Sequence, residues 1–307
     1  MSRFLVIGDA TLDVTVAASG PLRGGGDTPA RIRFAPGGQG ANVAVRLARR
    51  EADVTLVAPV GKDASGRLLT EALHAEGVRL APIDSDRSST VVAMLDGAGE
   101  RSMLSDRQQI PADAITPMLA APAWIHLSAY ALVDAGEGDA LAAALEGRPL
   151  GAWLSIAGGS IPPDAEVAAG MRQRLAAARP ELLVVNRDEA AALLGRQAST
   201  ADTARALAQL APVAVVTAAG QGSAASVSGT LVEVPAAPAA GPVVDATGSG
   251  DAYLASLVLE LADGWPPSPL EMERAMARAS ESGARAARVH GAQGRIEGEA
   301  AAPGVPR

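Results

Sequence analysis

The sequence predicts an α/β protein built on a central, mostly parallel β-sheet. Short runs rich in Val, Ile and Leu alternate with longer amphipathic segments along most of the chain, a pattern typical of βαβ units. The chain has 307 residues, of which 48% are hydrophobic, so it is long enough to bury a large core. Only 2% of the residues are aromatic, and we therefore expect a core of Ala, Val and Leu.

The expected elements follow this alternation. Buried strands are predicted at residues 4–8, 54–60, 124–127, 153–156, 182–185 and 213–217. Helices are predicted at residues 41–50, 65–76, 137–146, 165–178, 188–194, 203–210, 251–261 and 270–289. A hairpin is expected from residues 223–227 and 230–234, joined by Ser228 and Gly229.

Two stretches break the alternation. Residues 13–34 alternate polar and apolar side chains around three consecutive glycines, and residues 90–105 form a second hairpin pattern around the turn 97–99. We expect both to be antiparallel strands outside the main sheet, forming a small second layer over its edge. The Ala- and Pro-rich tail, residues 297–307, is expected to be mobile.

Composition excludes several kinds of chemistry. The chain has no cysteine, which rules out disulfides, thiolate nucleophiles, zinc knuckles and iron–sulfur clusters. Its single lysine, Lys62, lacks the glycine and the Ser or Thr of a phosphate-binding P-loop. A glycine fingerprint for a dinucleotide is also absent after the first strand.

Charge and hydropathy bear on partners and location. The formal net charge of -8 argues against a generic nucleic-acid binder, which needs a clustered positive face. No apolar stretch reaches the roughly 18 residues of a membrane span, and the start is too short for a signal peptide. We therefore expect a cytoplasmic protein.

The strongest candidate site is the run from Asp245 to Asp251, Asp-Ala-Thr-Gly-Ser-Gly-Asp, which leads directly into an apolar helix. Gly248, Ser249 and Gly250 allow backbone N–H groups to converge at a helix start, where an anion is stabilised. Asp251, in the first turn, could remove a proton from a hydroxyl that then attacks the bound anion. An ordinary helix cap with turn glycines explains the run equally well.

A second glycine-rich run precedes the helix expected at 41–50. Gly37, Gly38, Gln39 and Gly40 allow a ligand to approach closely, and Gln39 and Asn42 offer hydrogen bonds suited to hydroxyls. A strand-to-helix turn capped by Asn42 is the simpler interpretation of this run taken alone.

Carboxylates also flank two predicted strand ends. Asp9 and Asp13 bracket the end of the first strand, where α/β sheets bind ligands, and Asp13 could accept hydrogen bonds from vicinal sugar hydroxyls. Turn capping is the alternative for both. Asn186 and Glu189 could order waters around Mg²⁺, although the pair also fits a helix capping box.

The remaining polar features are weaker. The strand-turn 215–222, with Thr217, Gly220 and Gly222, is compatible with a nucleotide phosphate. The three histidines, His74, His126 and His290, show no spacing for a metal or a catalytic triad, and we interpret them as incidental.

Taken in order, these runs resemble the ribokinase or PfkB family of carbohydrate and nucleoside kinases, from residue 4 to about 292. Two runs carry the resemblance: Gly-Gly-Gln-Gly-Ala-Asn at 37–42, and Asp-Ala-Thr-Gly-Ser-Gly-Asp at 245–251. Each is moderately specific, and the ordered pair is highly specific. The resemblance implies a single ribokinase-like domain, a three-layer sandwich with a β lid formed from about 13–35 and 88–106.

The resemblance also implies an activity and a set of roles. The activity is transfer of the γ-phosphoryl group of ATP, with Mg²⁺, to a hydroxymethyl group of a small sugar or a nucleoside. Asp251 would be the base, the amides of 248–251 the anion hole, and Asp13, Gly38 and Asn42 sugar contacts. Asn186 and Glu189 would govern Mg²⁺ and phosphate placement, and Thr217 with Gly222 the nucleotide. The lid would close over the substrate and join a homodimer.

The sequence departs from the family pattern at several positions. Ala219 replaces the usual first glycine of the nucleotide turn, next to Gly220, and Gln39 stands where ribokinases carry lysine. Ser280 stands near an adenine-side asparagine, Ser128 near a substrate-contacting glutamate, and the strand at 153–156 lacks a following aspartate. These differences put ribose specificity in doubt. Asp245 and Thr247 resemble the monovalent-cation site of ribokinases, which leaves K⁺ activation open.

Three functions remain open at this point. A sugar kinase is favoured over a nucleoside kinase, because a base is usually held by aromatic stacking and only Phe34 is aromatic in the expected lid. The third is a sugar- or nucleotide-binding protein without catalysis. The intact Asp251 behind its glycine turn argues against that alternative.

Overall fold

A computed structural model describes residues 3–22, 24–95, 101–161, 164–238 and 241–300. Within these residues the main sheet has nine strands in the order β13-β12-β11-β10-β9-β8-β1-β4-β5. Its strands are β1 Arg3–Ile7, β4 Asp53–Gly61, β5 Arg79–Ser85, β8 Trp124–Ser128, β9 Trp153–Ala157, β10 Leu182–Asn186, β11 Val213–Thr217, β12 Ser223–Val227 and β13 Thr230–Val234. All pairings are parallel except those of β12 with β11 and β13, which confirms the predicted α/β class.

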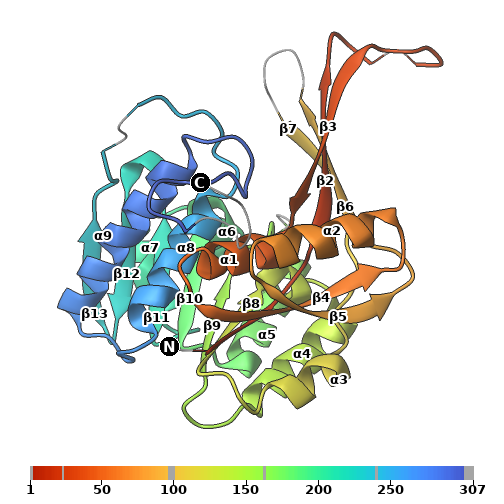
Figure 1. Cartoon of the computed structure of the whole chain (residues 1–307). Helices are drawn as coiled ribbons and strands as arrows, with labels where there is room; N and C mark the ends of the chain where they lie inside the picture. Colours follow the sequence, from red (N-terminus) through yellow and green to blue (C-terminus); the bar gives the residue numbers. More distant parts are fainter. Residues whose placement is uncertain (1–2, 23, 96–100, 162–163, 239–240, 301–307) are drawn as a thin grey trace.

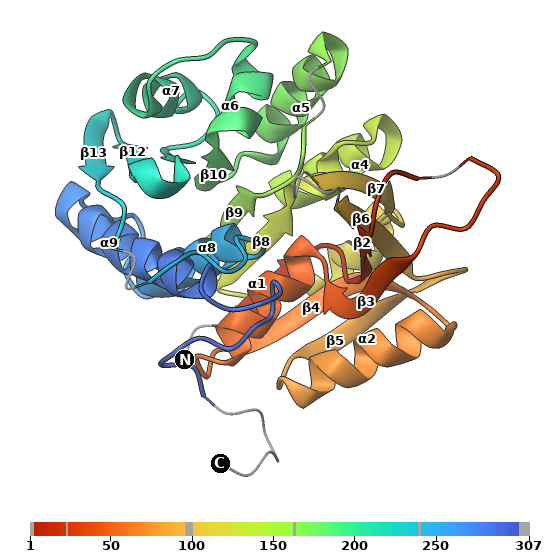
Figure 2. The same cartoon turned by 90° about the horizontal axis from the view of Figure 1, so that it is seen from above.

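Helices cover both faces of this sheet (Figures 1 and 2). One face carries α1 Gln39–Ala48, α2 Ala64–Ala75, α8 Ser249–Leu261 and α9 Pro269–Ala286. The other carries α3 Ala112–Ile115, α4 Ala135–Glu146, α5 Ala165–Ala178, α6 Arg187–Leu194 and α7 Thr200–Leu207. Short 3-10 turns lie at Thr116–Met118, Ala129–Leu132 and Ala219–Gln221. None of the described helices has the length and apolarity that a membrane crossing requires.

The strands divide their side chains between the two helical layers. In β1, Phe4 and Val6 belong to the core under α1 and α8, whereas Leu5 and Ile7 belong to the core under α4 and α5. Because successive side chains enter opposite cores, a central strand covered on both faces consists of a continuous run of apolar residues. Strand β5 was not predicted, because Pro82 interrupts its short apolar run and Arg79 and Asp84 flank that run, as is common in edge strands.

A second, four-stranded sheet stands above the body (Figure 1). It comprises β2 Thr11–Ala18, β3 Ala30–Gly37, β6 Ser89–Leu95 and β7 Arg101–Asp106, in the order β3-β2-β6-β7. The predicted hairpins are present as the antiparallel pairs β2/β3 and β6/β7. The expectation of a purely antiparallel layer is wrong, because β2 and β6 pair in parallel. Between the two hairpins the chain returns to the main sheet and forms β4, α2 and β5. The predicted turn at 97–99 lies outside the described residues.

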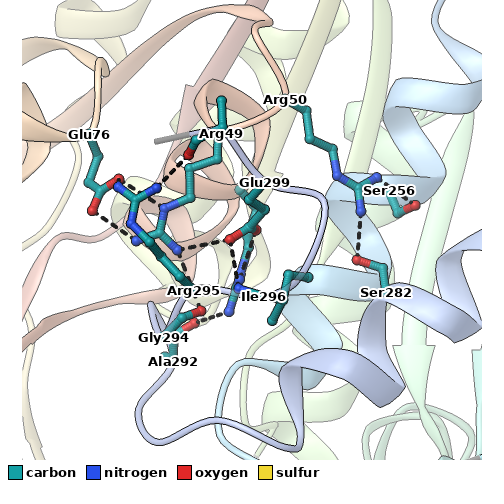
Figure 3. A network of polar contacts seen from close by, with 12 residues as sticks. Arg49, Arg50, Glu76, Ser256, Ser282, Ala292, Gly294, Arg295, Ile296 and Glu299 are labelled. Carbon is teal, nitrogen blue, oxygen red and sulfur yellow. Dashed lines mark hydrogen bonds and ion pairs between the residues drawn. The ribbon is translucent and has the colours of Figure 1, made fainter. Parts of the chain in front are cut away.

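The C-terminal residues lie against α1, and we call residues 291–300 the C-terminal strap. Glu299, whose side chain is 1% exposed, pairs with Arg46 at 2.8 Å and with Arg49 at 3.2 Å (Figure 3). The backbone N–H of Ala300 donates to the carbonyl of Arg49. The tail expected to be mobile from residue 297 is therefore held in place up to Ala300, and residues 301–307 lie outside the described part.

Arg46 of α1 and the two arginines that follow the helix, Arg49 and Arg50, tie it to its neighbours; Figure 3 shows Arg49 and Arg50. Arg49 also forms an ion pair with Glu76 at the end of α2. Arg50 donates to the hydroxyls of Ser256 on α8 and Ser282 on α9, both at 2.9 Å. Buried arginines need partners, and α1 is thereby tied to α2, α8, α9 and the strap.

Candidate active site

A cavity of about 280 Å³ lies between the four-stranded sheet and the carboxyl ends of the main strands. Ten of the residues singled out from the sequence line it: Asp13, Gly38, Gln39, Asn42, Asn186, Glu189, Thr217, Thr247, Gly250 and Asp251. They come from β2, from the starts of α1 and α8, and from the ends of β10 and β11. Parallel strands bring their carboxyl ends to one edge, which is where open α/β sheets bind ligands.

Helix α8 begins at this cavity in the way the glycine run predicts. Gly248, its N-cap, has φ 76°, and a Cβ there would lie 2.6 Å from the backbone of Ala292, so the turn requires glycine. The hydroxyl of Ser249 donates to the carbonyl of Ala246 at 2.8 Å. The backbone N–H of Ser249 donates to the carbonyl of Ala246 at 3.2 Å. The next N–H groups, those of Gly250 and Asp251, have no partner inside the helix, and both residues line the cavity.

A hydrogen bond links the carboxylate of Asp251 to the first helical turn of α1. The Asn42 side-chain amide donates to Asp251 Oδ2 at 2.8 Å, and Gln293 Nε2 donates to Asn42 Oδ1 at 3.1 Å, which fixes the orientation of that amide. Burial raises the pKa of Asp251 to about 6, against the opposing effects of Asn42 and of the positive charge on Arg46. A carboxylate of this pKa is largely ionised at neutral pH and remains basic enough to accept a proton.

The start of α1 forms the opposite wall. Gly38 has φ 96°, and a Cβ there would lie 2.5 Å from the carbonyl oxygen of Asp9. A Cβ at Gly37 would overlap the carboxylate of Asp13, which also accepts a hydrogen bond from the Thr11 hydroxyl at 2.6 Å. Close approach of β2 and β3 thus places the Asp13 carboxylate beside the first turn of α1.

Asn186 and Glu189 form the capping box that the sequence allowed as an alternative. Asn186 accepts the backbone N–H groups of Asp188 and Glu189 at 2.9 Å, and Glu189 accepts that of Asn186. Both residues also line the cavity, so capping and a role in the site coexist. Burial raises the pKa of Glu189 to about 7, with smaller contributions from the charges of Asp251 and Asp188.

These residues fit a magnesium ion that is bound jointly with a phosphorylated substrate. No group of three His, Cys, Asp or Glu side chains suited to a metal occurs in the described part of the chain. Mg²⁺ in kinases is commonly held by one or two carboxylates, phosphate oxygens and waters. A partly buried carboxyl such as Glu189, with a raised pKa, gains from a nearby cation.

Several predicted residues lie outside the lining of the cavity, among those described: Gly37, Gly220, Gly222, Asp245, Gly248, Ser249 and Ser280. Ser280 on α9 accepts the backbone N–H of Ala237 at 2.9 Å. The oxygens of Asp245 accept the N–H groups of Thr247 at 2.9 Å and Gly291 at 3.0 Å, linking the α8 turn to the strap. The nucleotide roles of these residues stay predictions.

The turn after β11 keeps the conformation of a glycine turn despite its substitution. Ala219 has φ 47° and Gly222 has φ 92°, and a Cβ at Gly222 would overlap the carbonyl of Val234. A left-handed backbone is unfavourable for alanine. The resemblance places a glycine at this position, so Ala219 adopts a backbone that suits the residue it replaces.

Three further residues in or behind this cavity could not be found from the sequence: Arg107, Tyr130 and His126. Arg107, after β7, lines it and pairs with the buried Asp9, and its guanidinium lies 3.9 Å from the ring centroid of Tyr130. His126, interpreted above as incidental, contacts Gln39 from beneath. Asp9 and Arg107 are 98 positions apart, and no local pattern links them.

Comparison with known proteins agrees with this geometry. A family model described as pfkB family carbohydrate kinase matches residues 1–297. The chain belongs to the PfkB family of carbohydrate kinases. It is therefore a phosphotransferase that phosphorylates a carbohydrate hydroxyl with ATP, and the family implies a divalent metal with that ATP. The PfkB assignment confirms the resemblance stated above.

Individual relatives extend the comparison. The chain is 30% identical over 307 residues to a fructokinase of Klebsiella pneumoniae, covering 94% of both chains. Among solved structures, a ribokinase of Thermotoga maritima superposes with a TM-score of 0.78 at 19% identity and 95% coverage of both chains. A fructokinase of Vibrio cholerae, in a form with fructose, ADP and calcium ion bound, gives a TM-score of 0.76 at 25% identity and 95% coverage of both. The ribokinase-like fold is thus confirmed.

Proposed function

We propose that this PfkB kinase transfers the γ-phosphoryl group of ATP to a hydroxymethyl oxygen of a free ketose such as D-fructose. The hydrogen bond between Asn42 and Asp251 supports the assignment of the base and of the acceptor site. It joins the helix that begins at the glycine-rich sugar loop to the helix that begins at the anion-binding turn. An acceptor hydroxyl held near Asn42 would lie beside a carboxylate able to take its proton. The choice of a ketose follows the fructokinases to which the chain is similar.

The chemistry divides between these two helix starts. Asp251 removes the hydroxyl proton, the sugar oxygen forms a bond to the γ-phosphorus, and the bond to the β–γ bridging oxygen breaks to release ADP. The N–H groups at the start of α8 stabilise the charge that develops on the transferred phosphoryl group. This arrangement supplies electrostatic stabilisation without the lysine of a P-loop.

Asn186, Glu189 and Thr217 line the cavity side on which we place the phosphates. When bound, Mg²⁺ neutralises charge on the β- and γ-phosphates. Glu189 would hold it through water, and the charge of the ion would lower the pKa of this carboxyl from about 7 and keep it ionised. Gly220 and Gly222 would shape the nucleotide turn, and Ser280 would lie on the adenine side.

A sugar remains favoured over a nucleoside. Phe34 pairs across the sheet with Val14, on the face opposite to Asp13, so it cannot stack on a base bound near Asp13. Tyr130 lines the cavity, but Arg107 covers one face of its ring. An Escherichia coli pseudouridine kinase is 30% identical over 99 residues, only 31% of this chain.

We further propose that β2, β3, β6 and β7 form the lid over the sugar and that two lids join a homodimer. Asp13, Val91 and Met103 line the cavity from these strands. The opposite face carries Val14 and Phe34 among other apolar side chains, and Phe34 is exposed. Lid closure would exclude water from the phosphoryl transfer.

K⁺ activation is proposed at the loop that joins Asp245 and Thr247 to Gly291. The carboxylate of Asp245 accepts backbone N–H groups from both sides of this loop. Rates in KCl and NaCl at equal ionic strength test this point. Activation of at least severalfold by K⁺ alone is expected, and equal rates would contradict it.

A coupled assay of ADP release across pentoses, hexoses, sugar phosphates and nucleosides tests the function. We expect D-fructose or a related ketose to give the highest kcat/KM, and Asp251→Asn to lower kcat by 10³-fold or about that order. Thr247→Val, which alters the same turn without removing the base, is the matched control. Turnover by Asp251→Asn at the rate of the parent protein would disprove the assigned base.

A further inference from the structure

A chain of hydrogen-bonded side chains runs from the core to the sugar side of the cavity. Trp124 Nε1 donates to Ser155 Oγ at 2.9 Å, and His126 Nδ1 lies 3.1 Å from the same oxygen. On the other side of the ring, His126 Nε2 lies 3.1 Å from Gln39 Nε2 and 3.3 Å from its Oε1. Trp124, His126 and Ser155 are each at most 1% exposed, and Gln39 is 8% exposed.

The donors and acceptors of this chain assign its protons. Trp124 can only donate, and we assign the Ser155 proton to the carbonyl of Ile125 at 3.3 Å. The remaining lone pair of Ser155 Oγ then accepts from His126 Nδ1–H, which leaves Nε2 unprotonated. Nε2 accepts from Gln39 Nε2, the nearer of the two amide atoms, so the Gln39 oxygen is left for another donor.

The ring stays neutral, which keeps this arrangement intact. Burial lowers the pKa of His126 to about 3, far below any pH at which the protein would work. A neutral imidazole has one donor and one acceptor nitrogen, and here each has a partner. His126 therefore links Ser155 and Gln39 and is not a proton donor for catalysis.

Gln39 is held from a second side as well. Gly158, after β9, has φ 72°, and a Cβ there would lie 2.7 Å from Gln39 Cγ. Gln39 and Gly158 both line the cavity. The stem of the Gln39 side chain is thus packed against a glycine while His126 holds its amide.

We propose that His126 is a specificity-determining positioning residue, which fixes the Gln39 amide so that its oxygen accepts a hydrogen bond from one hydroxyl of the acceptor sugar. A fixed acceptor discriminates between epimers, because a hydroxyl on the wrong side of the ring leaves the buried oxygen unpaired. The proposal rests on the proposed sugar-kinase function. It accounts for a buried polar chain that the apolar core does not need.

Glutamine and asparagine at position 126 separate a positioning role of His126 from a structural one. His126→Gln places an amide near the Nε2 position and can keep Gln39, whereas His126→Asn places one near Nδ1 and keeps Ser155 alone. Both variants bury an uncharged amide at the same site, so their thermal stabilities should be similar. Steady-state constants are measured for D-fructose, D-tagatose, D-psicose and D-ribose, and for ATP, with isothermal titration calorimetry of each sugar without ATP.

We expect His126→Asn to raise the KM and the dissociation constant of the best sugar about tenfold. It should also narrow the selectivity among the ketoses, with the KM for ATP unchanged and kcat within about threefold of the parent. His126→Gln should stay within about threefold in all constants. In a double-mutant cycle, adding His126→Asn to Gln39→Ala should have no further effect on sugar binding.

Equal losses in both variants, or additive losses with Gln39→Ala, would overturn the assignment while sugar kinase activity stands. An unchanged sugar KM in His126→Asn would overturn it as well. If the parent protein neither binds nor phosphorylates any of these sugars, the proposed function fails first, and this role for His126 fails with it.

Discussion

The carboxyl of Asp251 sets an expectation for how the rate depends on pH. Burial raises its pKa to about 6, and only the ionised form can take the proton of the sugar hydroxyl. At saturating MgATP, kcat/KM for the sugar should fall tenfold per pH unit below about pH 6. A pH–rate profile of the parent protein measures this acid limb.

Substitution of Asn42 should shift the acid limb of the pH–rate profile in a direction that can be stated in advance. Its hydrogen bond to Asp251 stabilises the charged form and lowers the pKa of that carboxyl. Asn42→Ala removes the bond, so the limb should move to higher pH, in addition to any loss of sugar binding. Thr217→Val, which alters the same cavity without contacting Asp251, should leave the limb where it is, and a limb that moves equally in both variants would contradict this account.

The same raised pKa predicts how Asp251 affects stability. The pKa of about 6 in the folded protein exceeds the ordinary 3.8, so the folded state binds more protons between about pH 4 and 6. Stability therefore falls as the pH rises through this window, and above it the ionised, buried carboxylate costs on the order of 2–3 kcal/mol.

Asp251→Asn should accordingly be inactive but more stable than the parent protein at pH 7.5. The gain should shrink as the pH is lowered toward 4, because the parent carboxyl is then neutral as well. Urea unfolding of both proteins at several pH values measures the difference. A stability difference that does not depend on pH would show that Asp251 has an ordinary pKa.

At the scale of elements, the ion pairs of the C-terminal strap tie α1 to the end of the chain (Figure 3). Glu299 is 1% exposed and faces Arg46 and Arg49, whereas Glu76, which also pairs with Arg49, is 18% exposed. Removing one partner of a buried ion pair leaves the other charge uncompensated. Loss of the Glu299 charge should therefore lower the stability of the protein more than loss of the Glu76 charge.

We expect Glu299→Gln to lower the free energy of unfolding by about 3 kcal/mol and Glu76→Gln by about 1 kcal/mol. Urea unfolding with both variants in one buffer gives the comparison. Arg46 lies one helical turn after Asn42, so Glu299→Gln should also raise the sugar KM, while Glu76→Gln should not. Equal losses of stability in the two variants would mean that the Glu299 side chain is no better buried in solution than the Glu76 side chain.

Which elements could be predicted depends on how local their signals are. Central strands such as β8 and β10 are covered on both faces and therefore appear in the sequence as unbroken apolar runs. The edge strand β5 has no such run. The glycine turns of the site could be predicted because Gly38 and Gly248 need positive φ next to a helix start.

Other parts of the site have no local signal at all. His126 and Gln39 are 87 positions apart, and their contact exists only because α1 begins at the edge of the sheet where β8 ends. Glu299 lies in an Ala- and Pro-rich stretch that reads as a mobile tail. Its burial depends on Arg46 in α1 and Arg49 just after it, 253 and 250 positions away. Long-range partners of charged and polar side chains were therefore the part that the sequence could not reveal.

At the scale of the whole molecule, the two faces of the lid sheet have opposite characters. Strand register places eight large apolar side chains on the outer face: Leu12, Val14, Val16, Ile32, Phe34, Val92, Met94 and Leu104. Ile32, Phe34 and Leu104 are 54%, 65% and 58% exposed. An apolar face of this kind on a single chain is typical of an interface, and a second copy of the lid offers the matching surface.

Phe34→Arg tests this homodimer. The parent protein should sediment at twice the 30.8 kDa chain mass in analytical ultracentrifugation at micromolar concentration, and the variant should sediment as a monomer, because burying an unpaired arginine at an apolar interface is costly. Leu150→Arg, a similar change at a fully exposed leucine far from the lid, should leave the dimer intact. Since Asp13 lies on the inner face of β2, next to Val14 on the outer face, loss of the dimer should also raise the sugar KM severalfold. A parent protein that is monomeric at these concentrations would contradict the lid interface.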